Sequence, residues 1–198
     1  MSMWDERYSG TEYFYGTAPN DFLVHCVQYL PAGGNILCIA EGEGRNAVYL
    51  ARQGFKVTAV DASAAGVQKQ QRLAQEHNVS IHSLQQDLTD FDFGTEKWDG
   101  IVSVFCHLPP PLRLSVHQRC QTSLKPGGIM IVEAYRPEQA PRDTGGPSDP
   151  ELMLTEALLQ TELPALTPME SRSLERDVLE GHGHRGIGAV VQWVARKN

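Results

Sequence analysis

The sequence lacks the features that mark several classes of protein. It has no run of lysine and arginine and carries a formal net charge of −7, so we expect no nucleic-acid partner. No apolar run approaches the roughly 18 residues that span a bilayer, and the first residues contain no apolar signal core. These absences predict a cytoplasmic protein with no membrane partner.

Cysteine motifs typical of metal binding or redox chemistry are also missing. The four cysteines form no CxxC pair, so neither a zinc knuckle nor a thioredoxin motif is present. Cys26, Cys38 and Cys106 lie within or beside apolar runs and are expected to be buried free thiols. His182 and His184 stand two residues apart with no further ligand nearby, so no metal site is predicted.

What the sequence does contain fits one folded domain. Its 198 residues are 41% hydrophobic and 21% charged, which is ordinary for a globular domain with one large core. We expect a single domain, 1–198, with three parts. These are an N-terminal segment and helix (1–30), a central core (35–135), and a C-terminal part (136–198) with an insertion, a helix and a final hairpin.

Short apolar runs alternate with stretches of helical spacing. The strands predicted from these runs are 35–40, 56–60, 80–84, 98–105 and 129–134, with helices between them. This alternation predicts a Rossmann-like, doubly wound α/β fold. Residues 137–150 are expected to form a loop and 151–163 a helix. Strands at 171–180 and 187–196, joined by loop 181–186, predict an antiparallel β-hairpin that completes a seven-stranded, mostly parallel sheet.

A glycine loop with the pattern Gly42-x-Gly44-x-x-Ala47 follows the first predicted strand. Glycines let the backbone approach a ligand closely, and the next helix presents free N–H groups at its start. Asp61 lies about 20 residues further on, where an acid that binds ribose is expected. These features predict an adenosine-type ligand, and the glycine spacing alone suits a nicotinamide dinucleotide as well.

Three features favour S-adenosylmethionine over a dinucleotide. Glu41 and Glu43 flank the glycines, and carboxylates repel a pyrophosphate but not a sulfonium. Asp87 follows the third predicted strand and could accept a hydrogen bond from an adenine amino group. The chain also ends in a β-hairpin after the fifth strand.

Several segments resemble the successive motifs of class I S-adenosylmethionine-dependent methyltransferases: ILCIAEGEGRNAVYLARQGFKVTAVDAS, QQDL, WDGIVSVF and LKPGGIMIVE. The opening WDERYSGTEYFYGTAPNDFL and the closing EGHGHRGIGAVVQWVARK are similar to the tellurite-resistance and thiopurine methyltransferase branch. The resemblance implies methyl transfer to a small-molecule acceptor, such as a soft sulfur, selenium or tellurium nucleophile. It also implies that the cofactor is S-adenosylmethionine, which becomes S-adenosylhomocysteine when it loses its methyl group.

The chain departs from that family in the glycine loop. The family has Asp-Leu-Gly-Cys-Gly where this chain has Cys38-Ile39-Ala40-Glu41-Gly42. The acid on the first strand is therefore missing and one glycine is replaced by Ala40. We expect Glu41 to supply the carboxylate from three positions later.

The resemblance implies roles for cofactor binding across the chain. Glu41, Gly42 and Gly44 would hold the methionine part, Asp61 the ribose, and Asp87 the adenine. Plainer alternatives are a helix N-cap for Asp61 and a turn acid for Asp87. An N-terminal lid is expected to cover the cofactor, with ordinary aromatic packing as its alternative. The full predicted set is Trp4, Arg7, Tyr8, Glu41, Gly42, Gly44, Asn46, Asp61, Ala62, Asp87, Leu88, Phe105 and Cys106.

Three residues are predicted on the acceptor side. His107 follows the fourth strand, where it would orient the acceptor or take a proton, unless it is a packing histidine. His184 and Arg185 lie in the final hairpin and resemble a His-Arg pair of tellurite-resistance relatives. No acid–histidine pair is evident from spacing, so catalysis by proximity is expected.

Two other functions remain open at this stage. A nicotinamide-dependent oxidoreductase would use the same glycine pattern, and the altered first strand is compatible with a non-catalytic cofactor-binding protein. We expect a monomer or a weak homodimer.

Overall fold

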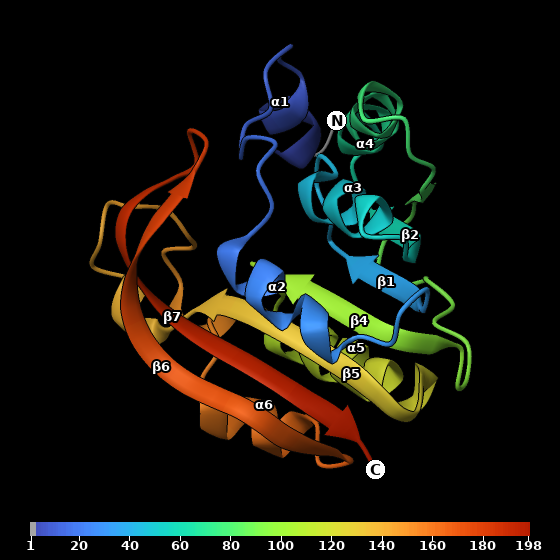
Figure 1. Ribbon diagram of the computed structural model, residues 1–198. Coiled ribbons are helices and arrows are strands. Elements are labelled where there is room, and N and C mark those ends of the chain that lie inside the picture. Colours follow the sequence, from blue (N-terminus) through green and yellow to red (C-terminus); the bar gives the residue numbers. More distant parts are fainter. Residues whose placement is uncertain (1–2) are drawn as a thin grey trace.

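The computed structural model describes residues 3–198 and contains one seven-stranded sheet in the order β3-β2-β1-β4-β5-β7-β6 (Figure 1). The strands are β1 (Asn35–Ile39), β2 (Lys56–Asp61), β3 (His82–Gln85), β4 (Trp98–Val104), β5 (Leu124–Tyr135), β6 (Leu166–Glu180) and β7 (His184–Lys197). The first five strands pair in parallel, and β7 lies antiparallel between β5 and β6. The predicted Rossmann-like fold with its terminal hairpin is confirmed.

Helices cover both faces of the sheet (Figure 1). They are α1 (Met3–Tyr8), α2 (Asp21–Cys26), α3 (Arg45–Arg52), α4 (Ala64–Glu76), α5 (Pro110–Ser123) and α6 (Glu156–Glu162), with 3-10 turns η1 (Val27–Tyr29), η2 (Pro137–Gln139) and η3 (Pro150–Leu152). Alternate residues of β1 pack into two different hydrophobic cores, one on each face of the sheet. Ile36 and Cys38 pack with α2 and α3, whereas Leu37 and Ile39 pack with α5 and α6. This two-sided burial explains the continuous apolar run in the sequence.

The helix predicted at 151–163 is shorter than expected. Residues 150–152 form η3, and α6 begins only at Glu156. The reason is local, because the Thr155 side chain accepts the N–H of Leu158 and caps the helix at that point. The prediction of a helix from residue 151 is therefore wrong in its first five residues.

The final hairpin is longer and tighter than predicted. β6 begins at Leu166, and β7 begins at His184, where Glu180 pairs with His184 across the turn. His184 was expected in a polar loop, but it is a strand residue with 5% of its surface exposed. The hairpin thus carries this side chain into the interior.

All four cysteines are free and buried, as predicted for three of them. Within residues 3–198, no helix is both long enough and apolar enough to span a membrane.

Candidate functional site

The glycine loop lies at the carboxyl ends of β1 and β2, between β1 and α3. Gly42 and Gly44 have φ values of 65° and 98°, which glycine adopts without steric cost. A Cβ on Gly42 would lie 2.9 Å from the Tyr8 hydroxyl, and one on Gly44 would lie 2.8 Å from Cα of Gln70. The two glycines are therefore required by close packing as well as by backbone conformation.

Glu41 caps the helix that follows the loop. Its Oε1 accepts the backbone N–H groups of Asn46 and Ala47 at 2.9 and 2.8 Å. Burial raises the pKa of Glu41 to about 7, although these hydrogen bonds oppose the shift. The Cys38 thiol lies within hydrogen-bonding reach of the same carboxylate. Glu41 thus places a buried carboxyl group beside the end of the first strand from a position in the loop.

Two residues at the ends of neighbouring strands are in the left-handed region. Ala40 follows β1 with φ 48°, and Phe105 follows β4 with φ 51°. This conformation costs a residue with a side chain about 1–3 kcal/mol and is concentrated at functional sites. Its occurrence at both strand ends marks this edge of the sheet as a candidate site.

Asp61 joins the end of β2 to the glycine loop. Its Oδ2 accepts the N–H of Gly42 and its Oδ1 accepts the N–H of Ser63, both at 2.8 Å. Burial, together with the nearby carboxylates of Asp5 and Glu43, raises the pKa of Asp61. Ser63, rather than Asp61, is the N-cap of α4, because its hydroxyl accepts the N–H of Gly66.

The N-terminal segment covers this loop. Tyr8 of α1 is 5% exposed with its hydroxyl against Gly42, and Trp4 stacks on Tyr8 at a centroid distance of 5.6 Å. Arg7 lies 4.8 Å above the Trp4 ring and donates a hydrogen bond to the Tyr15 hydroxyl at 3.1 Å. The structure therefore brings together the four residues of the predicted lid, which are Trp4, Arg7, Tyr8 and Tyr15.

Glu43 fastens the next part of the N-terminal segment. Its Oε2 accepts the backbone N–H of Phe14 at 2.7 Å, and its Oε1 is 2.6 Å from the ammonium of Lys69 on α4. This buried ion pair ties the glycine loop, α4 and the covering segment into one unit.

The predicted adenine residues are less enclosed. Asp87 is exposed, and its Oδ1 accepts the N–H of Thr89 at 2.7 Å, which is the geometry of a turn acid. Ala62 is also exposed, whereas Leu88 is buried.

Cys106, which was also predicted to bind the cofactor, is buried. Burial and the nearby negative charge of Asp61 raise the pKa of its thiol to about 12. The thiol therefore remains protonated and cannot serve as a thiolate nucleophile.

Five rings form what we call the aromatic cluster: Tyr15, Phe105, His107, Tyr135 and His184. The His184 ring lies 4.7 Å from Tyr15, 4.6 Å from Phe105 and 5.2 Å from Tyr135, measured between centroids. His107 stacks on Tyr135 at 5.8 Å with an interplanar angle of 12°. The cluster gathers side chains from the ends of β4 and β5, the start of β7 and the N-terminal segment.

His107 is held in one tautomer. Its Nδ1 lies 3.1 Å from the carbonyl oxygen of Leu152 in η3, which can only accept a hydrogen bond. Nδ1 therefore carries the proton and Nε2 carries the lone pair. Burial, together with the proximity of His184, lowers the pKa of His107 to about 4, although the hydrogen bond to Leu152 opposes the shift. At neutral pH this side chain is uncharged and a weak base.

His184 forms an acid–histidine pair that sequence spacing did not reveal. Its Nδ1 is 3.1 Å from Oε2 of Glu180, and the same oxygen accepts from Arg45 at 2.6 Å. Burial disfavours the charged form of Glu180, but hydrogen bonds and charges from His184 and Arg45 outweigh it and lower the pKa to about 2. Glu180 is thus a permanent anion that orients His184.

Arg185 does not join His184 at the site. Neighbouring residues of a strand point to opposite faces, and Arg185 is exposed. Its Nε donates to the carbonyl oxygen of Gly181 in the hairpin turn at 3.0 Å. The structure therefore separates the two members of the predicted His-Arg pair.

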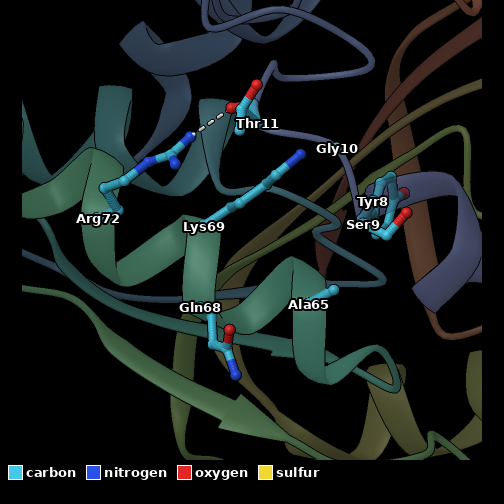
Figure 2. A pocket seen from close by; sticks show the side chains of 8 residues that line it. All are labelled: Tyr8, Ser9, Gly10, Thr11, Ala65, Gln68, Lys69 and Arg72. Carbon is cyan, nitrogen blue, oxygen red and sulfur yellow. Dashed lines mark hydrogen bonds between the residues drawn. The ribbon is translucent and has the colours of Figure 1, made fainter.

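A surface pocket of about 330 Å³ lies on the outer side of this assembly (Figure 2). It is lined by Tyr8, Ser9, Gly10, Thr11, Ala65, Gln68, Lys69 and Arg72. Its cations already have partners, since Lys69 pairs with Glu43 and Arg72 donates to the carbonyl oxygen of Thr11, drawn in Figure 2. The pocket reflects how α1 packs on α4 and lies apart from the aromatic cluster.

Sequence reasoning missed Glu180 and Tyr135. Both stand at strand ends, but only the pairing of β6 with β7 and of β5 with β7 brings them to the cluster. Glu180 could have been identified from the sequence, because it stands four residues before His184 and the two are separated by a Gly-x-Gly turn.

Residues 36–128 match a family described as a methyltransferase domain. The ubiquinone biosynthesis O-methyltransferase of Actinobacillus pleuropneumoniae is 30% identical over 106 residues, covering 50% of this chain and 44% of that protein. The chain spans less than half the length of the curated relatives it matches.

Solved structures show the same architecture. TehB from Haemophilus influenzae has a TM-score of 0.75 and 19% identity, covering 98% of this chain and 66% of that one. The N-methyltransferase NodS from Bradyrhizobium japonicum, in complex with S-adenosyl-L-homocysteine, has a TM-score of 0.73 and 16% identity, covering 98% and 96%. At these identities the likeness establishes the fold.

Proposed function

Because residues 36–128 match a methyltransferase domain and the chain has the fold of class I S-adenosylmethionine-dependent methyltransferases, we propose that this protein transfers a methyl group from S-adenosylmethionine to a small-molecule acceptor. When bound, the cofactor supplies a methyl group on a positively charged sulfur for in-line attack by a nucleophile. The chain's residues hold the cofactor, exclude water and move a proton.

The observation that carries this proposal is the position of Asp61. Each of its carboxylate oxygens accepts one backbone N–H and keeps further lone-pair capacity. That capacity at the end of β2 suits the two hydroxyls of a ribose. The charge of the neighbouring Glu43 is compensated by Lys69, so it does not distinguish S-adenosylmethionine from a nicotinamide dinucleotide, and the ligand panel below makes that distinction.

The lid residues support water exclusion. Tyr8 and Trp4 form an apolar cover over Gly42, and the segment beyond them is held to the loop by Glu43. A closed cover lowers the local dielectric and keeps water from competing with the acceptor.

His184 is the proposed proton acceptor. Donation from Nδ1 to Glu180 leaves Nε2 as the basic nitrogen, and the carboxylate stabilises the imidazolium that forms when the ring takes a proton. This arrangement favours a nucleophile that loses a proton, and replaces the expectation of catalysis by proximity alone. His107 is the weaker candidate, since its pKa of about 4 makes it a poor base.

The acceptor that this geometry favours is a hydroxyl compound. A soft sulfur, selenium or tellurium centre needs little help from a base, so the Glu180–His184 pair gives it no advantage. One relative is named for methylation of oxygen, which agrees with a hydroxyl acceptor. A non-catalytic binding protein remains the second candidate, because Ala40 departs from the family's glycine.

The experiment is a thermal-shift panel with S-adenosylmethionine, S-adenosylhomocysteine, NAD and NADP. A ligand at 100 times its Kd stabilises the folded chain by about 2.7 kcal/mol, so binding is readily detected. We expect the first two compounds to raise the melting temperature and the dinucleotides to leave it unchanged. Stabilisation by NAD with no effect of S-adenosylhomocysteine would reject the proposal.

Calorimetry on Asp61→Asn tests the ribose role directly. The affinity for S-adenosylhomocysteine should fall about tenfold or more, since hydrogen bonds to a charged group contribute about 1.5–3 kcal/mol. Asp92→Asn is the matched control, because Asp92 is an exposed turn acid that caps Gly94. Equal affinities in the two variants would remove Asp61 from the site.

A further inference from the structure

Two buried polar atoms of the aromatic cluster have no hydrogen-bond partner among the described residues: Nε2 of His107 and the hydroxyl of Tyr135. Only five buried side-chain atoms in residues 3–198 share this condition, and these two lie on rings that stack on each other. An unpaired buried polar atom is destabilising, and native proteins keep few of them. Two such atoms lie on stacked rings at the edge of the sheet where the parallel strands end, and this arrangement points to a ligand that bonds to both.

The chemistry of each atom restricts that ligand. Since Nδ1 of His107 donates to the Leu152 carbonyl, Nε2 can only accept a hydrogen bond. The Tyr135 hydroxyl can donate and accept. A group with one O–H would satisfy both atoms, donating to the first and accepting from the second.

The surroundings are apolar rings with no uncompensated charge. Phe105 and Tyr135 lie 4.7 Å apart between centroids, and both contact His184. The carboxylates that act on Tyr135 are both paired, since Glu180 is bonded to Arg45 and His184, and Glu133 is bonded to Arg176. An ionised ligand would lose its hydration here and find no free counter-charge, so an uncharged ring is preferred.

A glycine pair covers the rings from the insertion between β5 and α6. A Cβ on Gly145 would lie 2.7 Å from the His184 ring, and one on Gly146 would lie 2.6 Å from the Tyr135 ring. Both glycines have left-handed φ values, 113° and 88°. The backbone thus lies directly against two members of the cluster.

We propose that His107 and Tyr135 form the acceptor subsite and that it binds an uncharged aromatic hydroxyl compound whose O–H donates to Nε2 of His107. This proposal rests on the proposed function, which it deepens by naming the acceptor class. His184 is in ring contact with Tyr135 and is held by Glu180, so the bound hydroxyl turns its one hydrogen from Nε2 of His107 to Nε2 of His184 before it loses the proton. His107 is a binding residue in this arrangement.

The test uses three naphthalene probes on the full chain, titrated by calorimetry with and without S-adenosylhomocysteine. The probes are 2-naphthol, 2-methoxynaphthalene, which has no donor, and 2-naphthoate, which is an anion. We expect 2-naphthol to bind about tenfold more tightly than the methyl ether, because the ether has no O–H and leaves Nε2 of His107 without a hydrogen bond. The anion should bind weakest.

Two variants then locate the binding. Tyr135→Phe removes only the unpartnered hydroxyl and should weaken 2-naphthol binding several-fold while leaving the melting temperature unchanged or higher. His107→Ala should abolish the preference for 2-naphthol over its methyl ether. Tyr49→Phe on α3 and His77→Ala at the end of α4 are matched controls outside the cluster and should keep the wild-type preference.

The outcomes separate the two proposals. Equal binding of 2-naphthol and its ether, tighter binding of the anion, no binding of any probe, or wild-type preference in both cluster variants each overturns the subsite. Failure of S-adenosylhomocysteine to bind rejects the proposed function instead, while the titrations without it still measure the donor preference.

Discussion

The carboxylate of Glu41 accepts the backbone N–H of Ala47 at 2.8 Å and so caps α3 from within the glycine loop. In the class I methyltransferases that this chain resembles, the acid of this region stands on the first strand. Here the strand position is Cys38, and the side chain of Glu41 folds back to it. The loop keeps a buried acid while changing which residue carries it.

The raised pKa of Glu41 predicts a specific dependence of stability on pH. Because its folded pKa of about 7 exceeds the usual value of 4.5, this group contributes stability that is present below about pH 4.5 and lost as the pH rises to 7. The full effect is about 3 kcal/mol. Glu41→Gln mimics the protonated acid, so its unfolding free energy should change less than wild type between pH 4.5 and 7. Parallel curves from chemical denaturation of the two proteins would show that Glu41 does not titrate there.

Glu180 predicts the opposite behaviour at lower pH. Its folded pKa of about 2 lies below the usual 4.5, so its contribution is present above pH 4.5 and lost as the pH falls toward 2. Glu180→Gln should be less stable than wild type at neutral pH by about 3 kcal/mol, and the difference should shrink below pH 4.5. Denaturant midpoints measured at pH 7 and pH 3 test this. A pH-independent difference would mean that the loss comes from packing rather than from charge.

Ala40→Gly should stabilise the chain. Ala40 has a φ of 48°, where a side chain costs about 1–2 kcal/mol, and the added freedom of glycine when unfolded cancels part of the gain. We expect a net increase of about 0.5–1 kcal/mol in the free energy of unfolding. The matched control is Ala51→Gly within α3, which should lower stability by about 1 kcal/mol. Two equal losses would mean that the left-handed backbone of Ala40 is unstrained.

Gly146→Ala should act on the acceptor and not on the cofactor. The new methyl group would lie 2.6 Å from the Tyr135 ring, so the covering loop must move. We expect the affinity for 2-naphthol to change several-fold while that for S-adenosylhomocysteine stays the same. Gly127→Ala is the control, because Gly127 also has a left-handed φ of 77° but open space around it. If both substitutions leave 2-naphthol binding at the wild-type level, the loop does not cover the subsite.

The sequence was sufficient to predict the fold because its signals are local. The run Asn35–Ile39 is apolar throughout, since β1 is covered on both faces, and the glycines after it fix the loop. The position of the glycine loop was predictable for the same reason, as Gly42 comes soon after β1 and Asp61 ends β2. The helix predicted at 151–163 shows where the local pattern was insufficient. The apolar spacing predicted a start at residue 151, but the capping hydrogen bond of Thr155 starts the helix at Glu156.

The aromatic cluster could not be predicted in the same way. His184 and Arg185 are adjacent in sequence, and only the register of β7 decides that one is buried and the other exposed. Tyr135 and Glu180 are 45 positions apart, and each gains its role from packing against β7. Such contacts depend on strand pairing over long sequence separations, which no local pattern encodes.

The carboxylate of Glu180 bonds both Arg45, at the start of the cofactor-loop helix, and His184, in the aromatic cluster. Any event that alters the charge on one partner therefore changes the electrostatic environment of the other. Glu180 is a single side chain shared by the two parts of the proposed site, so we expect the binding of cofactor and acceptor to be coupled rather than independent.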